Sequence, residues 1–185
     1  TEAPSYLKSL QVFQSAGMHL SGIPMDAQGL QMDALSALAQ RPHRRGGTIL
    51  YTIPTNQNPT GITMSLPRRE ALLRFGAENR LPIIEDGAYE ELCFSPAPPS
   101  LKALDRAGTV LYLGSASKSL APGLRIGWVV ASEPIVQRLG DVKMQTDYGA
   151  SSISQWIFAE FLSSGLYDEY LVQLRGILRE RRDRA

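Results

Sequence analysis

Residues 110–127 read VLYLGSASKSLAPGLRIG. Their first part, residues 110–114, is an apolar run typical of a buried strand, and residues 126–131 predict a second strand. The segment between them is a polar loop. Its lysine, Lys118, stands between two serines directly after a buried strand, which is unusual for a packing role. This stretch therefore predicts both a strand of the sheet and the chemistry at the end of that strand.

The rest of the chain alternates strand and helix patterns. Short apolar runs predict further strands, and residues at helical spacing predict amphipathic helices. The strands are expected at 19–24, 48–53 and 82–85, and the helices at 6–16, 29–40, after Ser65, from 134, at 154–163 and at 167–182. Residues 41–47 predict a turn, and Ser65 is expected to cap the helix that has Pro67 in its first turn. The alternation predicts an α/β fold, with a mainly parallel sheet flanked by helices.

Composition excludes some function classes and leaves others open. The 185 residues contain 19 Lys plus Arg and 18 Asp plus Glu, so the net charge of +1 gives no global reason to expect nucleic-acid binding. A single cysteine, Cys93, cannot form an intrachain disulfide and fits a cytoplasmic protein. No secretory signal and no apolar run of membrane-spanning length are visible, so no membrane partner is expected. His19 and His43 have no ligands at metal spacing, so we predict no metal site.

The loop after residue 114 carries groups that suit an aldehyde and a phosphate. An unprotonated lysine such as Lys118 can form an imine with an aldehyde. The hydroxyls of Ser115 and Ser117 can bind a phosphate, and Arg125 supplies donors in a fork suited to phosphate oxygens. The proline and glycine before Arg125 would bend the loop back. The alternative is a solvated turn with both cations facing water.

Polar residues also follow two other predicted strands. Asp86 ends the strand at 82–85, where a carboxylate can pair with a protonated ring nitrogen; the alternative is that it caps a helix. Tyr89 could offer a hydroxyl on the same side of a helical turn. Asn58 lies in an ordinary turn and matters only if its amide points into the same site. Because ligands bind at the carboxyl ends of parallel strands, we expect the loops of Asn58, Asp86 and Ser115 to converge.

Four motifs together carry a resemblance to a known family. Asn58–Gly61, Asp86–Tyr89, Ser115–Lys118 and Gly123–Gly127 resemble, in order and spacing, the fold-type I (class I/II) aminotransferases, which depend on pyridoxal 5'-phosphate. The resemblance implies that residues 1–185 are part of the cofactor-binding large domain. It also implies that the N-terminal segment and the C-terminal small domain, which normally grips the substrate carboxylate, are missing.

The resemblance also implies roles for individual residues. Lys118 is similar to the lysine that holds the cofactor and moves the substrate's α-proton. Asp86 is similar to the partner of the pyridine nitrogen. Asn58 and Tyr89 are similar to the partners of the phenolic oxygen. The phosphate would be bound by Ser115, Ser117 and Arg125.

A finer resemblance concerns residues 141–148, 151–155 and 165–183. These are similar to the aminotransferase-like domains of MocR-type regulators in the GntR superfamily, which carry a separate winged-helix domain. This implies an effector-sensing domain that binds an amino acid or amine, forms a homodimer at full length, and meets DNA only through a domain absent from this chain. The alternatives are part of a free-standing amino acid aminotransferase, acting on an amino acid and a 2-oxo acid, or an α/β domain without cofactor. Whether the protein is an enzyme stays open.

Overall fold

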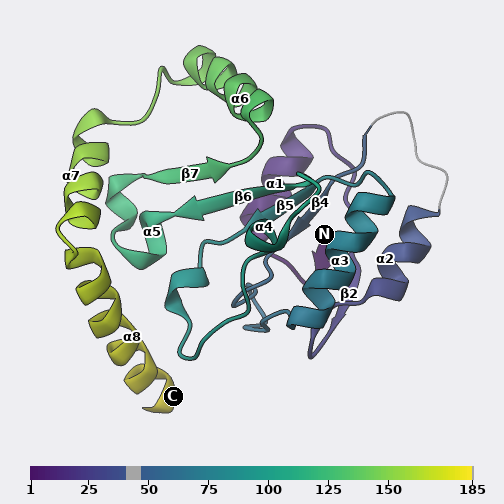
Figure 1. Ribbon diagram of the computed structural model, residues 1–185, viewed down its shortest axis with the longest axis horizontal. Helices are drawn as coiled ribbons and strands as arrows, with labels where there is room; N and C mark the ends of the chain where they lie inside the picture. Colours follow the sequence, from purple (N-terminus) through teal and green to yellow (C-terminus); the bar gives the residue numbers. More distant parts are fainter. Residues whose placement is uncertain (41–46, 185) are drawn as a thin grey trace. The chain divides into compact units, whose positions relative to one another are not determined.

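The computed structural model describes residues 1–40 and 47–184 (Figure 1). The predicted turn at 41–47 lies, except for Gly47, outside the described residues. The chain forms two compact units. Unit 1 comprises Thr1–Gly87 and Ala97–Tyr112, and unit 2 comprises Ala88–Pro96 and Leu113–Ala185.

Unit 1 is built on two small groups of strands. In the first, β1 (Glu2–Ala3) runs parallel to β2 (Ile23–Asp26), which pairs antiparallel with β3 (Gly29–Leu30). In the second, β4 (Leu50–Thr52) and β5 (Ile83–Asp86) are parallel, with Tyr51 opposite Ile84. Strand β6 (Val110–Ser115) begins beside β5, and just before it the Thr109 carbonyl accepts a hydrogen bond of 3.0 Å from the Ile83 N–H.

One helix boundary and one strand boundary differ from the prediction. The helix expected at 29–40 begins only at Met32 (α2, Met32–Ala39), and the strand expected at 19–24 begins at Ile23. The cause is a tight turn between β2 and β3. The Asp26 carboxylate accepts from the Gln28 N–H (2.8 Å), and Gly29 has a φ of +109°, which suits glycine. These local bonds favour a hairpin over a longer helix.

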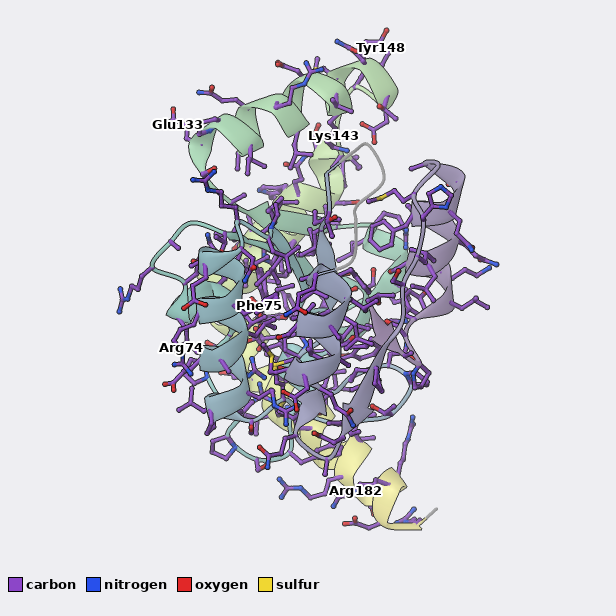
Figure 2. All side chains as sticks on the ribbon, turned by 90° about the vertical axis from the view of Figure 1, so that its right-hand side faces the viewer. Arg74, Phe75, Glu133, Lys143, Tyr148 and Arg182 are labelled. Atoms are coloured by element: carbon purple, nitrogen blue, oxygen red, sulfur yellow. The ribbon has the colours of Figure 1, made fainter. Side chains whose placement is uncertain are left out.

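Three helices of unit 1 contribute to its hydrophobic core: α2, α3 (Leu66–Glu78) and the short α4 (Leu101–Leu104). Of these, α2 and α3 pack side by side (Figure 1). Helix α1 (Leu7–Ser15) contacts β4 through Phe13, whose ring meets Tyr51. On α3, Arg74 is exposed and Phe75 packs against the core (Figure 2). Pro67 lies in the first turn of α3 as predicted, but the Ser65 hydroxyl bonds to the Gln28 side chain (3.1 Å) and makes no cap bond. The core residues include Leu30, Leu50, Leu72, Ile83, Leu101 and Val110.

A buried ionic group joins α3 to the end of β5. The side chains of Arg69 and Glu85 are 0% and 1% exposed, and their nearest atoms are 3.9 Å apart. The Glu85 carboxylate accepts two backbone N–H bonds of 2.7 Å at the start of α4. The Arg69 guanidinium donates to the oxygens of Met64, Pro54, Thr55 and Pro99. Because every charged group has several partners, this cluster can hold the strand ends in the core.

Unit 2 continues β6 and adds a helical segment. The short helix α5 (Ala116–Ser119) and the 3-10 helix η2 (Pro122–Leu124) lead to β7 (Gly127–Val130), which neighbours β6. Three longer helices follow: α6 (Glu133–Thr146), α7 (Ser152–Ser163) and α8 (Leu166–Arg184). Figure 2 shows Glu133 and Lys143 on α6. The predicted strands at 110–114 and 126–131 and the three predicted helices are confirmed in kind, with shifts of a few residues.

Aromatic packing supports α5. Trp128 of β7 stacks on Phe158 of α7 (centroids 5.8 Å apart), and Phe158 meets Tyr167 of α8 edge-on, also at 5.8 Å. The Tyr167 hydroxyl donates a 2.7 Å hydrogen bond to the Ser119 hydroxyl, the last residue of α5. The rings therefore connect α7 and α8 to the segment that carries Lys118.

Helix α8 is also tied to the segment around the 3-10 helix η1 (Glu90–Leu92). Arg175 donates to the Glu91 carbonyl (2.7 Å), and Arg182 lies 4.7 Å from the Phe94 ring centroid. Two arginines near the end of α8, Arg179 and Arg182, thus make cation–π contacts with Phe94. Across the two described ranges, no helix combines the length and apolar character needed to cross a membrane. The fold is α/β, with helices flanking the sheet.

Candidate cofactor site

The predicted site residues fall in both units. Asn58 and Asp86 belong to unit 1, and the other residues belong to unit 2: Tyr89, Ser115, Ser117, Lys118 and Arg125. Within unit 2 the structure brings Lys118 and Tyr89 together. The convergence of all three loops stays a prediction.

Asp86 is the last residue of β5 and is half-buried. Its carboxylate accepts a 2.5 Å hydrogen bond from the hydroxyl of Tyr51, a buried residue of the neighbouring strand β4. Asp86 is not the N-cap residue of the next helical element, η1, whose N-cap residue is Tyr89.

Asn58 lies in a turn organised by its neighbour Gln57. The Gln57 side chain is buried and accepts from the Thr60 N–H (3.0 Å) and hydroxyl (2.6 Å). Its amide also donates to the Pro4 carbonyl (2.9 Å). The local sequence predicts only a turn here, and Gln57 was not among the predicted site residues. The nearby Thr60 was the available signal, because threonine side chains in turns often bond to neighbouring groups.

Lys118 lies on α5, directly after β6. The Ser115 hydroxyl accepts from the Ser117 N–H (3.2 Å), which sets the first turn of α5. The exposed Lys118 amine lies 5.9 Å from the centre of the Tyr89 ring. The structure therefore brings two predicted site residues, Lys118 and Tyr89, to the same place in unit 2.

Arg125 returns to the segment that carries Lys118. The chain bends through η2, which packs against α5, and the Ile126 carbonyl accepts from the Ala116 N–H (3.1 Å). Arg125 itself has φ 55° and ψ 36°, the left-handed conformation. This conformation is costly for a residue other than glycine, and such strain is found most often at functional sites. Arg125 and Lys118 are both exposed, as the solvated-turn alternative expects. A simple solvated turn would not, however, need the backbone hydrogen bond and the packing of η2 on α5 that close this loop.

Three further residues of this region were not predicted: Tyr51, Ser9 and Ser119. Tyr51 was considered only as part of a buried strand. A buried tyrosine hydroxyl nearly always has a hydrogen-bond partner, so its position two residues from the strand end was a usable signal. Nothing in the local sequence pairs Ser9 with Tyr51, or Ser119 with Tyr167, because these contacts join residues more than forty positions apart.

The chemistry of these groups fits pyridoxal phosphate. Unit 2 offers a primary amine, two hydroxyls and a guanidinium on one closed loop, the set that an aldehyde and a phosphate ester require. Unit 1 offers a carboxylate held by a buried donor, which suits a protonated ring nitrogen. When bound, the ring would supply an electron sink. In the part of the chain that the structure describes, no cluster of three or more metal-ligating side chains occurs.

Comparison with known families now identifies the class of protein. The family model described as aminotransferase class I and II matches residues 1–185, and the chain belongs to that family. It is 52% identical over 186 residues to the uncharacterized HTH-type transcriptional regulator YisV of Bacillus subtilis. It is 36% identical over 183 residues to the HTH-type transcriptional regulator NorG of Staphylococcus aureus. These alignments cover 100% and 99% of the chain.

Solved aminotransferases have the same fold. The kynurenine aminotransferase of Pyrococcus horikoshii superimposes with a TM-score of 0.92 at 36% identity over 98% of the chain. LysN, the α-aminoadipate aminotransferase of Thermus thermophilus, complexed with N-(5'-phosphopyridoxyl)-L-leucine, has a TM-score of 0.90 at 38% identity over 97% of the chain. The chain spans 38% and 40% of the two regulators and 46% of each of these enzymes.

Proposed function

We propose that residues 1–185 are part of the pyridoxal-phosphate-binding large domain of a MocR/GntR-type transcriptional regulator, and that this domain senses an amino acid or amine. The observation that carries the proposal is the match of the whole chain to two HTH-type regulators, at 52% and 36% identity. The full-length protein would be a homodimer and would bind DNA through a separate domain.

The proposed roles follow the chemistry of each side chain. Lys118 holds the cofactor through its amine, and Asp86 faces the ring nitrogen. Tyr89, whose ring lies beside the Lys118 amine, and Asn58 bond to the phenolic oxygen. The phosphate is bound by Ser115, Ser117 and Arg125. Two observations support the role of Arg125. Its backbone has the left-handed conformation, which is costly for a residue other than glycine. A backbone hydrogen bond between Ala116 and Ile126 holds the loop closed around it.

The first test is cofactor attachment in the full-length protein. Borohydride reduction followed by peptide mass spectrometry is expected to find pyridoxal phosphate on Lys118. Lys118→Ala should lose this adduct completely. The matched control is Lys143→Ala, which removes a surface lysine paired with Asp147 on α6 and should keep the adduct. An adduct found on another lysine of the parent protein, or the absence of any adduct from it, would overturn the site assignment.

The second test separates a regulator from an enzyme. When the full-length protein is used to select from a random duplex DNA pool, it should return a defined sequence. Its affinity for that DNA should change when pyridoxal phosphate and an amino acid or amine are added. A free-standing aminotransferase is the second candidate, favoured by the TM-scores of 0.92 and 0.90 with solved enzymes. Half-transamination across an amino-acid panel, without any DNA selected, would establish that alternative.

A further inference from the structure

The strand pairing places Tyr51 on the same face of the sheet as Asp86. Tyr51 lies opposite Ile84 in the parallel ladder, and side chains two residues apart on a strand share a face. The Tyr51 hydroxyl therefore reaches diagonally to the Asp86 carboxylate, at 2.5 Å. Glu85 points to the opposite face, where Arg69 and α4 hold it.

Helix α1 fixes the Tyr51 side chain from the other direction. The Tyr51 hydroxyl lies 3.0 Å from the Ser9 hydroxyl, and the Tyr51 ring meets the Phe13 ring edge-on, with centroids 5.2 Å apart. Tyr51 is only 3% exposed, so its orientation is set by these contacts. The contacts join α1, β4 and the end of β5 within unit 1.

The direction of the hydrogen bonds follows from the chemistry of the groups. An ionised carboxylate can only accept, so the Tyr51 hydrogen points to Asp86, and Ser9 donates to the Tyr51 oxygen. Burial raises the pKa of Tyr51, and the charge and hydrogen bond of Asp86 add to the rise. The phenol thus stays a donor. A hydrogen bond to a charged acceptor is stronger than one between neutral groups.

From this geometry we propose that Tyr51 is a positioning residue for the cofactor's ring nitrogen. It orients the Asp86 carboxylate through its hydrogen bond, and Ser9 supports it. The proposal rests on the proposed function, in which Asp86 faces that nitrogen. A tyrosine that merely fills the core would not be coupled to the charge of Asp86.

The test uses the full-length protein and Tyr51→Phe, which keeps the ring against Phe13 and removes only the hydroxyl. Pyridoxal phosphate should bind about five- to tenfold more weakly. Tyr170→Phe is the matched control, since Tyr170 also packs edge-on against a phenylalanine, Phe161, and it should leave the affinity unchanged.

A double-mutant cycle separates positioning from packing. In an Asp86→Asn background, Tyr51→Phe should weaken cofactor binding by less than about twofold, because the charge that it supports is gone. An equal loss in both backgrounds, or wild-type binding by Tyr51→Phe, would overturn this inference. If Tyr51→Phe does not fold, Ser9→Ala gives the same test, with about a two- to threefold loss expected. Failure of the proposed function looks different: the parent protein would not bind the cofactor, or Asp86→Asn would bind it as the parent does.

Discussion

Unit 1 and unit 2 hold their own proposed site residues by different means. In unit 1 the strand that ends at Asp86 is held by buried polar groups, with Arg69 and Glu85 on one face and Tyr51 on the other. In unit 2 the short helix of Lys118 is supported by the packed rings of Trp128, Phe158 and Tyr167, and Lys118 is exposed. A carboxylate that stabilises charge gains from fixed donors, whereas an amine that must meet an aldehyde needs access.

The two units also each contain a buried tyrosine that donates a hydrogen bond next to a proposed site residue. Tyr51 donates to the charged Asp86, and Tyr167 donates to the neutral hydroxyl of Ser119. Losing a donor to a charge costs more than losing one to a neutral group. Changes to the polar interior of unit 1 should therefore cost more stability than comparable changes to unit 2.

The largest effect is expected for Arg69→Met. This change leaves the buried Glu85 carboxylate without the Arg69 cation and removes the Arg69 hydrogen bonds to the carbonyl oxygens of Met64, Pro54 and Pro99. The expected cost is about 3–5 kcal/mol, as for other broken buried ion pairs. Hydrogen exchange by mass spectrometry on the full-length protein should show the loss in peptides covering β4 and β5.

The matched control for that experiment is Arg74→Met on the same helix, α3. Arg74 is exposed, as Figure 2 shows, so its loss should change exchange rates very little. Equal protection in the Arg69→Met protein and its parent would contradict the idea that buried charge holds the strand that carries Asp86.

A smaller effect is expected in unit 2 for Gly114→Ala. A Cβ at Gly114 would lie 2.0 Å from the Trp128 ring, so the ring must move away from β6. Overpacking of this kind costs about 1–3 kcal/mol, and here it should also displace α5. Exchange should increase in peptides covering residues 113–120, and borohydride trapping on Lys118 should become slower.

The control for Gly114→Ala is Gly140→Ala on α6, where the added methyl group meets no atom within 4 Å. Alanine favours the helix there by about 0.5–1 kcal/mol. If both alanine variants behave alike, the close contact between Gly114 and Trp128 does not support the Lys118 turn.

The fold class, the strand at 110–114 and the candidate residues could be predicted from the sequence, because periodicity and strand-end polarity are local signals. The hairpin at residues 26–29 could not be predicted, because there a hydrogen bond from the backbone to the Asp26 side chain favours a turn over the expected helix. The contacts of Tyr51 and Tyr167 could not be predicted either, since they depend on which distant elements pack together. The missed residues are thus the ones that hold the candidate site residues in place, and the predicted ones are the candidates themselves.

The smallest effect is expected for Tyr167→Phe, which removes the hydrogen bond to Ser119 and keeps the ring against Phe158. The expected cost at neutral pH is about 1 kcal/mol, the usual value for a neutral pair. Urea unfolding followed by tryptophan fluorescence should show this difference. A cost as large as that of Arg69→Met would contradict the contrast between the units.

The difference in free energy of unfolding between the parent and Tyr167→Phe should depend on pH with a definite sign. Burial raises the pKa of Tyr167, and the charge of Glu91 adds to the rise, so the folded protein keeps the phenol proton longer than the unfolded chain does. The stabilisation from this group is complete below about pH 10, the ordinary value for tyrosine, and is lost as the pH rises through the folded value. The gap between the parent and Tyr167→Phe should therefore narrow above pH 10. A gap that stays constant there would show that Tyr167 ionises equally in both states and that the aromatic support of α5 is open to water.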